Sequence, residues 1–234
     1  MKNYSLIAVL LLTAGCNGNP ARSNNTTSTQ QGVIVITSLN VKNDSAYKKF
    51  KDYISAPLDK HHGKIVRDFN VMGEANGSIN FGPVNRLFVI KFPNNQDNNL
   101  FFRDSTVKKQ LKKLNSNNLK IISGGMLSPL SDRNGELFVL KISNYKSNDG
   151  KAQKIADKIN LELKQNYGFH LDIAIRSTST KNIKRADEVA IFLYTKAASQ
   201  KALYKNGRIM QQIGDFNMKY LNDFVYLALK PLEN

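Results

Sequence analysis

The 234-residue sequence has one cysteine, no tryptophan and three histidines. Because Cys16 is the only cysteine, no disulfide can form within the chain. Three scattered histidines without further thiols do not supply the three or four closely arranged ligands of a zinc site. The chain also lacks both kinds of glycine-rich phosphate-binding loop and the nucleophile elbow of a serine hydrolase. These absences predict no metal, no bound cofactor and no recognisable catalytic set.

Acidic side chains are scarce as well, since 18 Asp and Glu stand against 34 Lys and Arg and leave a net charge of +16. The resulting pI near 9.8 favours contact with an anionic surface, such as lipid headgroups or another anionic envelope component. Solvated faces of amphipathic helices explain many of the same lysines equally well; these are Lys48, Lys49, Lys51, Lys108, Lys109, Lys112 and Lys113. No RNA-recognition, zinc-finger or helix-turn-helix pattern is present, so a nucleic-acid partner is not expected.

The N-terminus has no apolar run long enough to span a bilayer, because residues 6–12 fall far short of the roughly 20 residues that a membrane helix needs. Lys2, this short run and the small residues 13–15 are instead typical of a cleaved signal peptide. Residues 12–16 resemble the bacterial lipobox, in which the cysteine is acylated and becomes the first mature residue. The resemblance implies a signal peptide over 1–15 and a lipid anchor at Cys16. An ordinary signal peptide with an incidental cysteine remains the alternative.

Residues 16–31 contain no large apolar side chain after the cysteine and are predicted to be a disordered tether. A flexible chain of this length reaches about 20 Å on average. Several acyl chains on one residue hold a protein stably at a membrane. By resemblance to Gram-negative lipoproteins, Asn17 implies an envelope location at the outer membrane, facing the periplasm, if the source is Gram-negative.

The remaining residues, about 200, contain one pattern of strands and helices twice. In the first copy we expect strands at 32–41, 64–72, 84–92 and 119–126, a helix that begins after the cap cluster 43–45 and ends at 62–63, a turn-rich stretch at 73–83, and a helix at 100–114. In the second copy we expect strands at 136–145, 170–177, 188–194 and 223–229, and helices at 151–167 and 199–220. Capping residues at 104–105 and 206–207 predict a break in the last helix of each copy.

Each copy has the order βαββαβ, which is the ferredoxin-like split βαβ unit. Segment 101–111 aligns without gaps on segment 203–213, 102 residues later, which favours a duplication. We therefore predict an α+β protein with two tandem ferredoxin-like repeats at 32–128 and 134–231. Because helices cover only one face of such a sheet, the two sheets are expected to face each other as an intramolecular pseudo-dimer.

With this arrangement the sequence resembles the dimeric α+β barrel superfamily. The first repeat resembles an uncharacterised branch of small bacterial proteins over roughly 33–127, on the strength of Tyr47 and of segments 62–67, 86–93, 102–105 and 121–125. The second repeat has no His-Gly-Lys/Arg segment, so it shares only the fold. The superfamily includes cofactor-free monooxygenases, haem-degrading enzymes and chlorite dismutases, and the resemblance implies a pocket between sheet and helices.

A haem enzyme of this kind needs a proximal histidine, and the chain offers His61, His62 and His170. The first two are expected at the C-terminal end of a helix, where a cationic side chain meets the negative end of the helix dipole. His170 opens a strand and is expected at the surface or in a hydrogen bond. Local structural roles are therefore favoured over haem ligation.

Polar residues that interrupt strands are the remaining candidates for a site. Alternation along a strand places Arg67 and Asn70 on opposite faces unless a bulge intervenes, so only one of them can line an inter-sheet pocket beside Arg86. An arginine in such a pocket would select an anionic or carbonyl-bearing ligand. We therefore take His62, Arg67 and Arg86 as candidate ligand-binding residues, with a surface position at the sheet rim as the alternative for the arginines.

Three functions remain open. The missing catalytic set favours a non-catalytic envelope lipoprotein that binds a small ligand or an envelope partner. The alternative is a cofactor-free monooxygenase-like or haem-related enzyme working in the pocket of the first repeat, which predicts a closed cavity containing His62, Arg67 or Arg86. The third is a structural or adhesive role that depends on charge alone.

Overall fold

The computed structural model describes residues 32–113, 119–147 and 150–232; Cys16 and the tether lie outside them. The strands are β1 (Val33–Leu39), β2 (Lys64–Gly77), β3 (Arg86–Phe92), β4 (Lys120–Met126), β5 (Leu137–Tyr145), β6 (Phe169–Lys181), β7 (Glu188–Tyr194) and β8 (Leu221–Pro231). The helices are α1 (Asp44–Lys60), α2 (Asn95–Arg103), α3 (Ser105–Lys113), α4 (Lys151–Tyr167), α5 (Ala197–Tyr204) and α6 (Gly207–Tyr220). None of these helices is both long and apolar enough to cross a bilayer.

The predicted breaks in the last helix of each half are confirmed, and side-chain capping explains both of them. The Asp104 carboxylate accepts a hydrogen bond from the backbone N–H of Thr106, with 2.8 Å between the two atoms, and α3 begins there. The Asn206 side chain accepts from the backbone N–H of Ile209 at 3.3 Å and caps α6. These oxygens satisfy N–H groups that have no partner inside a helix.

β8 runs two residues beyond its predicted bounds at each end, and β2 and β6 continue further still. β2 continues to Gly77, through part of the expected turn at 73–83, because it pairs there with β8 and sets Gly77 opposite Val225. β6 continues to Lys181 because its second part pairs with β4. Both extensions depend on a partner from the other half of the chain, which a local pattern does not contain.

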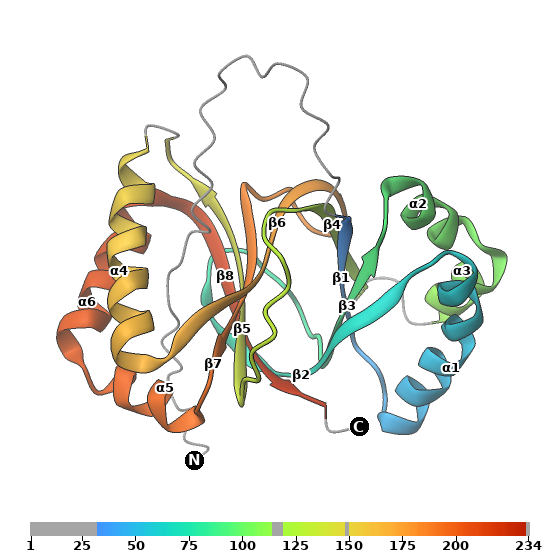
Figure 1. The fold of residues 1–234 in the computed structure, drawn as a ribbon, viewed down its shortest axis with the longest axis horizontal. Helices are drawn as coiled ribbons and strands as arrows, with labels where there is room; N and C mark the ends of the chain where they lie inside the picture. Colours follow the sequence, from blue (N-terminus) through green and yellow to red (C-terminus); the bar gives the residue numbers. More distant parts are fainter. Residues whose placement is uncertain (1–31, 114–118, 148–149, 233–234) are drawn as a thin grey trace.

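The eight strands close into one antiparallel barrel in the order β1-β3-β2-β8-β5-β7-β6-β4. Each half contributes four neighbouring strands, and the halves are joined where β2 pairs with β8 and β4 pairs with β6. Helices α1–α3 cover one side of the barrel and α4–α6 the other (Figure 1). The predicted α+β architecture with facing sheets is confirmed, and closure pairs both edges of each four-stranded sheet.

The core has three parts. The barrel lumen is filled by buried aliphatic and aromatic side chains from alternate strand positions, among them Ile34, Leu87, Ile173 and Leu227. A second cluster lies between α4–α6 and the strands beneath them, and a third lies between α1–α3 and theirs. In the described barrel the space between the two sheets is therefore largely packed with apolar side chains.

Candidate functional site

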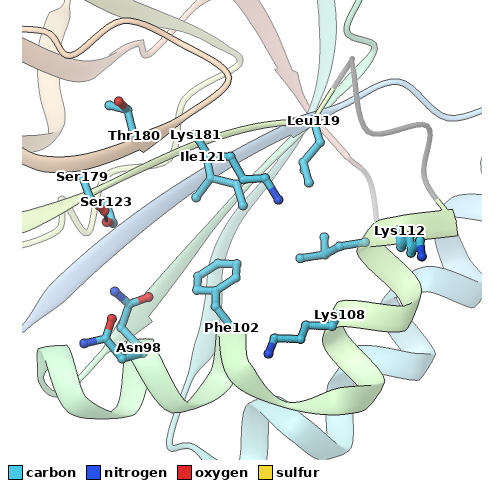
Figure 2. Close-up of a pocket in the computed structure, with 12 residues that line it drawn as sticks. Asn98, Phe102, Lys108, Lys112, Leu119, Ile121, Ser123, Ser179, Thr180 and Lys181 are labelled. Carbon is cyan, nitrogen blue, oxygen red and sulfur yellow. Dashed lines mark hydrogen bonds between the residues drawn. The ribbon is translucent and has the colours of Figure 1, made fainter.

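A pocket of about 420 Å³ lies between helices α2 and α3 and strands β4 and β6 (Figure 2). Its wall is formed by Asn98, Asn99, Phe102, Lys108, Leu111, Lys112, Leu119, Ile121, Ser123, Ser179, Thr180 and Lys181. The volume is in the range of small-molecule binding sites. Because β6 belongs to the second half of the chain, residues of both halves form the pocket wall.

Regular spacing arranges the two long walls of this pocket. Asn98 and Phe102 are one helical turn apart and so share a face of α2. Leu119, Ile121 and Ser123 alternate along β4 and its approach, so their side chains point to the same side of the sheet. Figure 2 shows Phe102 between Asn98 at one end of the pocket and Lys108 and Lys112 towards the other.

The polar end of the pocket contains an unsatisfied buried amide. Asn98 is only 7% exposed, and its Oδ1 accepts no hydrogen bond in the described structure. Nearby in the wall, the Oγ atoms of Ser123 and Ser179 are 2.6 Å apart and join β4 to β6. A buried polar atom without a partner is unfavourable by about 1–3 kcal/mol, so a ligand or a water molecule that pairs with it is expected.

The other end of the pocket is cationic. This end, called the mouth, is lined by three exposed lysines, Lys108 and Lys112 from α3 and Lys181 from β6. The sequence of α3 contains four lysines and no acidic residue. No aspartate or glutamate is among the residues of the wall. The mouth is therefore a region of positive potential beside an apolar interior.

The described pocket wall contains no haem-ligating side chain and few groups suited to acid–base chemistry. Histidine, carboxylate, tyrosine and cysteine are missing from it, and lysine is the only common proton-transfer group among the residues that line the pocket. The usual axial ligands of haem are His, Cys, Met and Tyr, and none of them is among the residues that line the pocket. The residues present therefore do not fit a haem. The described residues also include no cluster of three or more groups able to hold a metal ion.

The structure places the three histidines away from this pocket. His62 follows α1 with a left-handed backbone (φ 54°), its side chain is 72% exposed, and its Nδ1 lies 3.4 Å from Oδ1 of Asp97. His61 is buried at the helix end, with Nε2 3.8 Å from the Asp104 carboxylate. Burial and nearby positive charges lower the pKa of His170. None of the three reaches the barrel interior of the first half or the pocket wall.

Arg67 and Asp172 meet inside the barrel because each strand carries a bulge. The pairing register shifts between Ile65 and Arg67 in β2 and between Leu171 and Ile173 in β6. A bulge adds an unpaired residue and re-aims the side chains around it. Since β2 and β6 lie four places apart in a closed ring of eight strands, a contact between them must cross the lumen.

This contact is a bidentate ion pair. Arg67 donates from Nε to Oδ2 of Asp172 at 2.9 Å and from Nη2 to Oδ1 at 2.6 Å. Nη2 also donates to the backbone oxygen of Ser131 at 2.8 Å, which holds the segment between the halves over the barrel mouth. Asp172 is fully buried. All these groups are engaged in structural contacts.

Arg86 lies on the other face of the sheet, under the helices. Its cross-strand partner is Asn70, so these two share a face that Arg67 does not, as the alternation predicted. The guanidinium pairs with Asp44 and lies 5.7 Å from the ring centre of Tyr47. The structure therefore brings no two of His62, Arg67 and Arg86 together.

A wider hollow of about 750 Å³ surrounds Arg67 at the barrel mouth. Its charged side chains include Lys51 and Asp68, whose Nζ and Oδ2 atoms are 2.7 Å apart. The Asp68 carboxylate also accepts a hydrogen bond from the Tyr47 hydroxyl at 2.5 Å. Burial and this carboxylate raise the pKa of Tyr47. The charges of Lys51, Arg67 and Asp68 are thus paired within the protein, and the hollow contains no unpartnered buried side-chain atom like that of Asn98 in the described structure.

A second buried charged cluster lies on the helix side of the second half. Lys141 is fully buried and donates from Nζ to Oε2 of Glu188 at 2.7 Å. The same oxygen accepts from the Tyr145 hydroxyl at 2.5 Å and from the Ser143 hydroxyl at 3.2 Å. Burial lowers the pKa of Lys141, and the Glu188 carboxylate opposes that shift. The hydrophobic cluster under helices α4–α6 includes the aromatic residues Phe192, Tyr194 and Tyr226.

Asn98 was not among the predicted site residues, because the second helix of the first half was predicted to begin only at residue 100. The helix begins at Asn95, and the preceding Asn94 caps it by accepting from the backbone N–H of Asp97 at 2.9 Å. The pair Pro93-Asn94 was the available signal, since asparagine is a preferred N-cap. A helix start at this pair would have placed Asn98 and Phe102 on one face of a helix.

A closed antiparallel barrel with helices outside is the fold of the dimeric α+β barrel superfamily. An anthrone oxidase-like protein superposes with a TM-score of 0.58 at 9% identity, covering 87% of this chain and 92% of that chain. A mutant chlorite dismutase from Candidatus Nitrospira defluvii superposes with a TM-score of 0.54 at 10% sequence identity, covering 86% of this chain and 92% of that chain. A candidate monooxygenase from Fusobacterium nucleatum has a TM-score of 0.50 at 10% sequence identity, and the match covers 86% of this chain and 92% of that chain. No family profile and no curated protein sequence matches this chain. At such identities the likeness shows the fold and not the activity.

Proposed function

We propose that this protein is a bacterial envelope lipoprotein whose barrel binds a small ligand between α2, α3, β4 and β6. The observation that carries the proposal is the unpartnered, buried amide oxygen of Asn98 in the wall of a pocket of about 420 Å³. The pocket combines an apolar interior with a few polar groups, which is the usual composition of a ligand site. The matching element order of the two halves supports their origin as duplicated ferredoxin-like repeats, with the second one closing the pocket of the first.

A neutral, apolar fluorescent dye such as N-phenyl-1-naphthylamine tests the pocket. Residues 17–234 contain every described element and are the protein to use. Ser179→Trp places a large side chain in the pocket wall, so we expect it to abolish the saturable rise in dye fluorescence that the parent protein shows. Ser55→Trp makes the same change on an exposed part of α1 and is expected to bind dye normally. Equal binding by the parent and Ser179→Trp would place the dye elsewhere and contradict the proposal.

The anchor is tested separately in cells. Cys16→Ser removes the only thiol that can be acylated, so we expect the protein to move from the membrane fraction to the soluble fraction and to lose incorporation of an alkyne-labelled fatty acid. Ser5→Cys/Cys16→Ser is the matched control, because it keeps one cysteine in the leader at another position, and we expect it to remain unlabelled. Retention of Cys16→Ser in the membrane fraction with unchanged labelling would contradict the lipoprotein assignment.

A second candidate function is a monooxygenase-like or haem-related enzyme acting in the same pocket. The observation in its favour is the shared fold with structures named anthrone oxidase-like and chlorite dismutase, together with a pocket between sheet and helices in the first half. The absence of histidine, tyrosine and carboxylate from the wall counts against it. Oxygen uptake with an anthrone substrate, lost in Ser179→Trp, would favour the enzyme over the binding protein.

A further inference from the structure

We propose that the ligand of this pocket is an anionic amphiphile, a molecule with an apolar body and one negatively charged head, such as a long-chain carboxylate. The inference rests on the proposed binding function and names the class of ligand. It follows from three regions of the pocket wall, which lie one after another in space: a polar end, an apolar middle and a cationic mouth.

The apolar middle fits a hydrocarbon body. Phe102, Leu111, Leu119 and Ile121 line it from both the helical and the sheet side. A chain or ring placed against these side chains is removed from water on several sides at once, which is the main source of affinity for apolar ligands. A small, fully hydrated ion would gain nothing from this surface.

The cationic mouth fits a negatively charged head. Lys108 and Lys112 are one turn apart on α3, so their side chains lie on one face. Neither they nor Lys181 forms an ion pair with a carboxylate within the described residues, unlike Lys51 and Lys184, which do. Three such lysines around one opening favour an anion there.

The register between β4 and β6 separates this mouth from the polar end. Ile121 pairs with Lys181, whereas Ser123 pairs with Ser179 two residues further along β4. Asn98 lies at the serine end and Lys108 and Lys112 at the other, as Figure 2 shows. A ligand with its head at the lysines therefore directs its far end to the Asn98 amide, where a hydroxyl group would find a partner.

Displacement of the neutral dye measures the contribution of the head directly. Dodecanoate and dodecanol have the same chain length and differ in the charged group. We expect the carboxylate to displace the dye at a concentration about tenfold lower than the alcohol, since two or three exposed charge contacts together favour the anion only modestly. Equal displacement by both would overturn the anionic class and leave the proposed function intact, whereas displacement by neither would overturn both.

Two double variants of α3 provide a matched control. Lys108→Gln/Lys112→Gln removes two charges from the pocket mouth, and Lys109→Gln/Lys113→Gln removes two charges from the same helix outside the pocket wall. We expect the first to weaken dodecanoate about tenfold and leave dodecanol unchanged, with little effect from the second. Equal weakening by both variants would mean that net charge alone attracts the anion, and the inference would fail.

The same chemistry has two sources near a membrane, a free carboxylate or an anionic lipid. Incubation with vesicles of phosphatidylcholine containing phosphatidylglycerol, followed by separation and lipid analysis, distinguishes them. Phosphatidylglycerol carried away by the parent protein and not by Lys108→Gln/Lys112→Gln supports the inference with a lipid source. Displacement of the dye by dodecanoate without lipid transfer supports it with a free amphiphile. Equal lipid transfer by the parent and the variant would overturn the role of the lysine mouth.

Discussion

Replacement of Arg67 by methionine is expected to lower the free energy of unfolding by about 3–5 kcal/mol, because it leaves a buried carboxylate without its partner. Asp172 has no exposed surface and accepts two hydrogen bonds from Arg67 across the lumen. Urea unfolding of both proteins measures the difference. Arg67→Met/Asp172→Leu removes both charges and is expected to recover most of the loss, since an apolar pair of similar volume replaces the ion pair. A single variant within about 1 kcal/mol of the parent would contradict the role assigned to the pair.

The decrease in the free energy of unfolding of Arg67→Met is also expected to depend on pH. Burial raises the pKa of Asp172, and the hydrogen bonds and charge of Arg67 oppose the increase. Without the arginine the folded-state pKa rises further above the unfolded value of 3.8. A group whose pKa is raised by folding stabilises the fold at low pH, and that contribution is lost as pH rises through the folded pKa. The variant should therefore differ most from the parent at neutral and alkaline pH and least in acid.

Replacement of Glu188 by glutamine is the second substitution with a large expected effect, again about 3–5 kcal/mol. The carboxylate stands 2.7 Å from the ammonium group of Lys141, which is fully buried. Glutamine keeps the shape and removes the charge, so the loss reports the ion pair and not a cavity. Lys141→Met/Glu188→Leu removes both charges and provides the control. If Glu188→Gln unfolded at the same urea concentration as the parent, the buried pair would not be a stabilising contact.

The pH dependence of Glu188→Gln is expected to have the opposite sign. Burial lowers the pKa of Lys141 below its ordinary 10.5, and the Glu188 carboxylate counteracts that decrease. In the variant the folded-state pKa falls further. A lowered pKa contributes stability above the unfolded value, and this is lost as pH falls through the folded value. The variant should therefore approach the parent as pH rises from neutral towards 10.5 and differ most at neutral pH and below.

Much of the fold was predictable because the elements are locally encoded. The helix over 151–167 and the strand over 188–194 have the predicted bounds, since apolar spacing and flanking turns mark both. The extensions of β2 and β6 were not predictable from these patterns, because pairing with the other half creates them. The barrel was predictable because helices were expected on only one face of the sheet in each half of the chain. The ion pair across the lumen was not, because it depends on two bulges that strand alternation does not predict.

The pocket was harder to predict than the fold. The resemblance implied a site between sheet and helices of the first half, and the pocket lies there, but its wall includes Ser179 and Lys181 from the second half. The lysines of α3 were assigned to a solvated face or a binding surface without a decision between them. Only the structure separates Lys108 and Lys112, which line the pocket, from Lys109 and Lys113, one position further along. The residues chosen from polar interruptions, His62, Arg67 and Arg86, lie in three separate places.

The most direct test of this account is the position of a bound amphiphile, read from amide shifts in nitrogen-15 spectra of residues 17–234 during a dodecanoate titration. We predict saturable shifts at the side-chain amide of Asn98 and at the backbone amides of Phe102, Ser123 and Ser179, which line the pocket. Shifts confined to the barrel mouth around Arg67, or no saturable shift at all, would contradict the claim that the pocket between α2, α3, β4 and β6 is the ligand site.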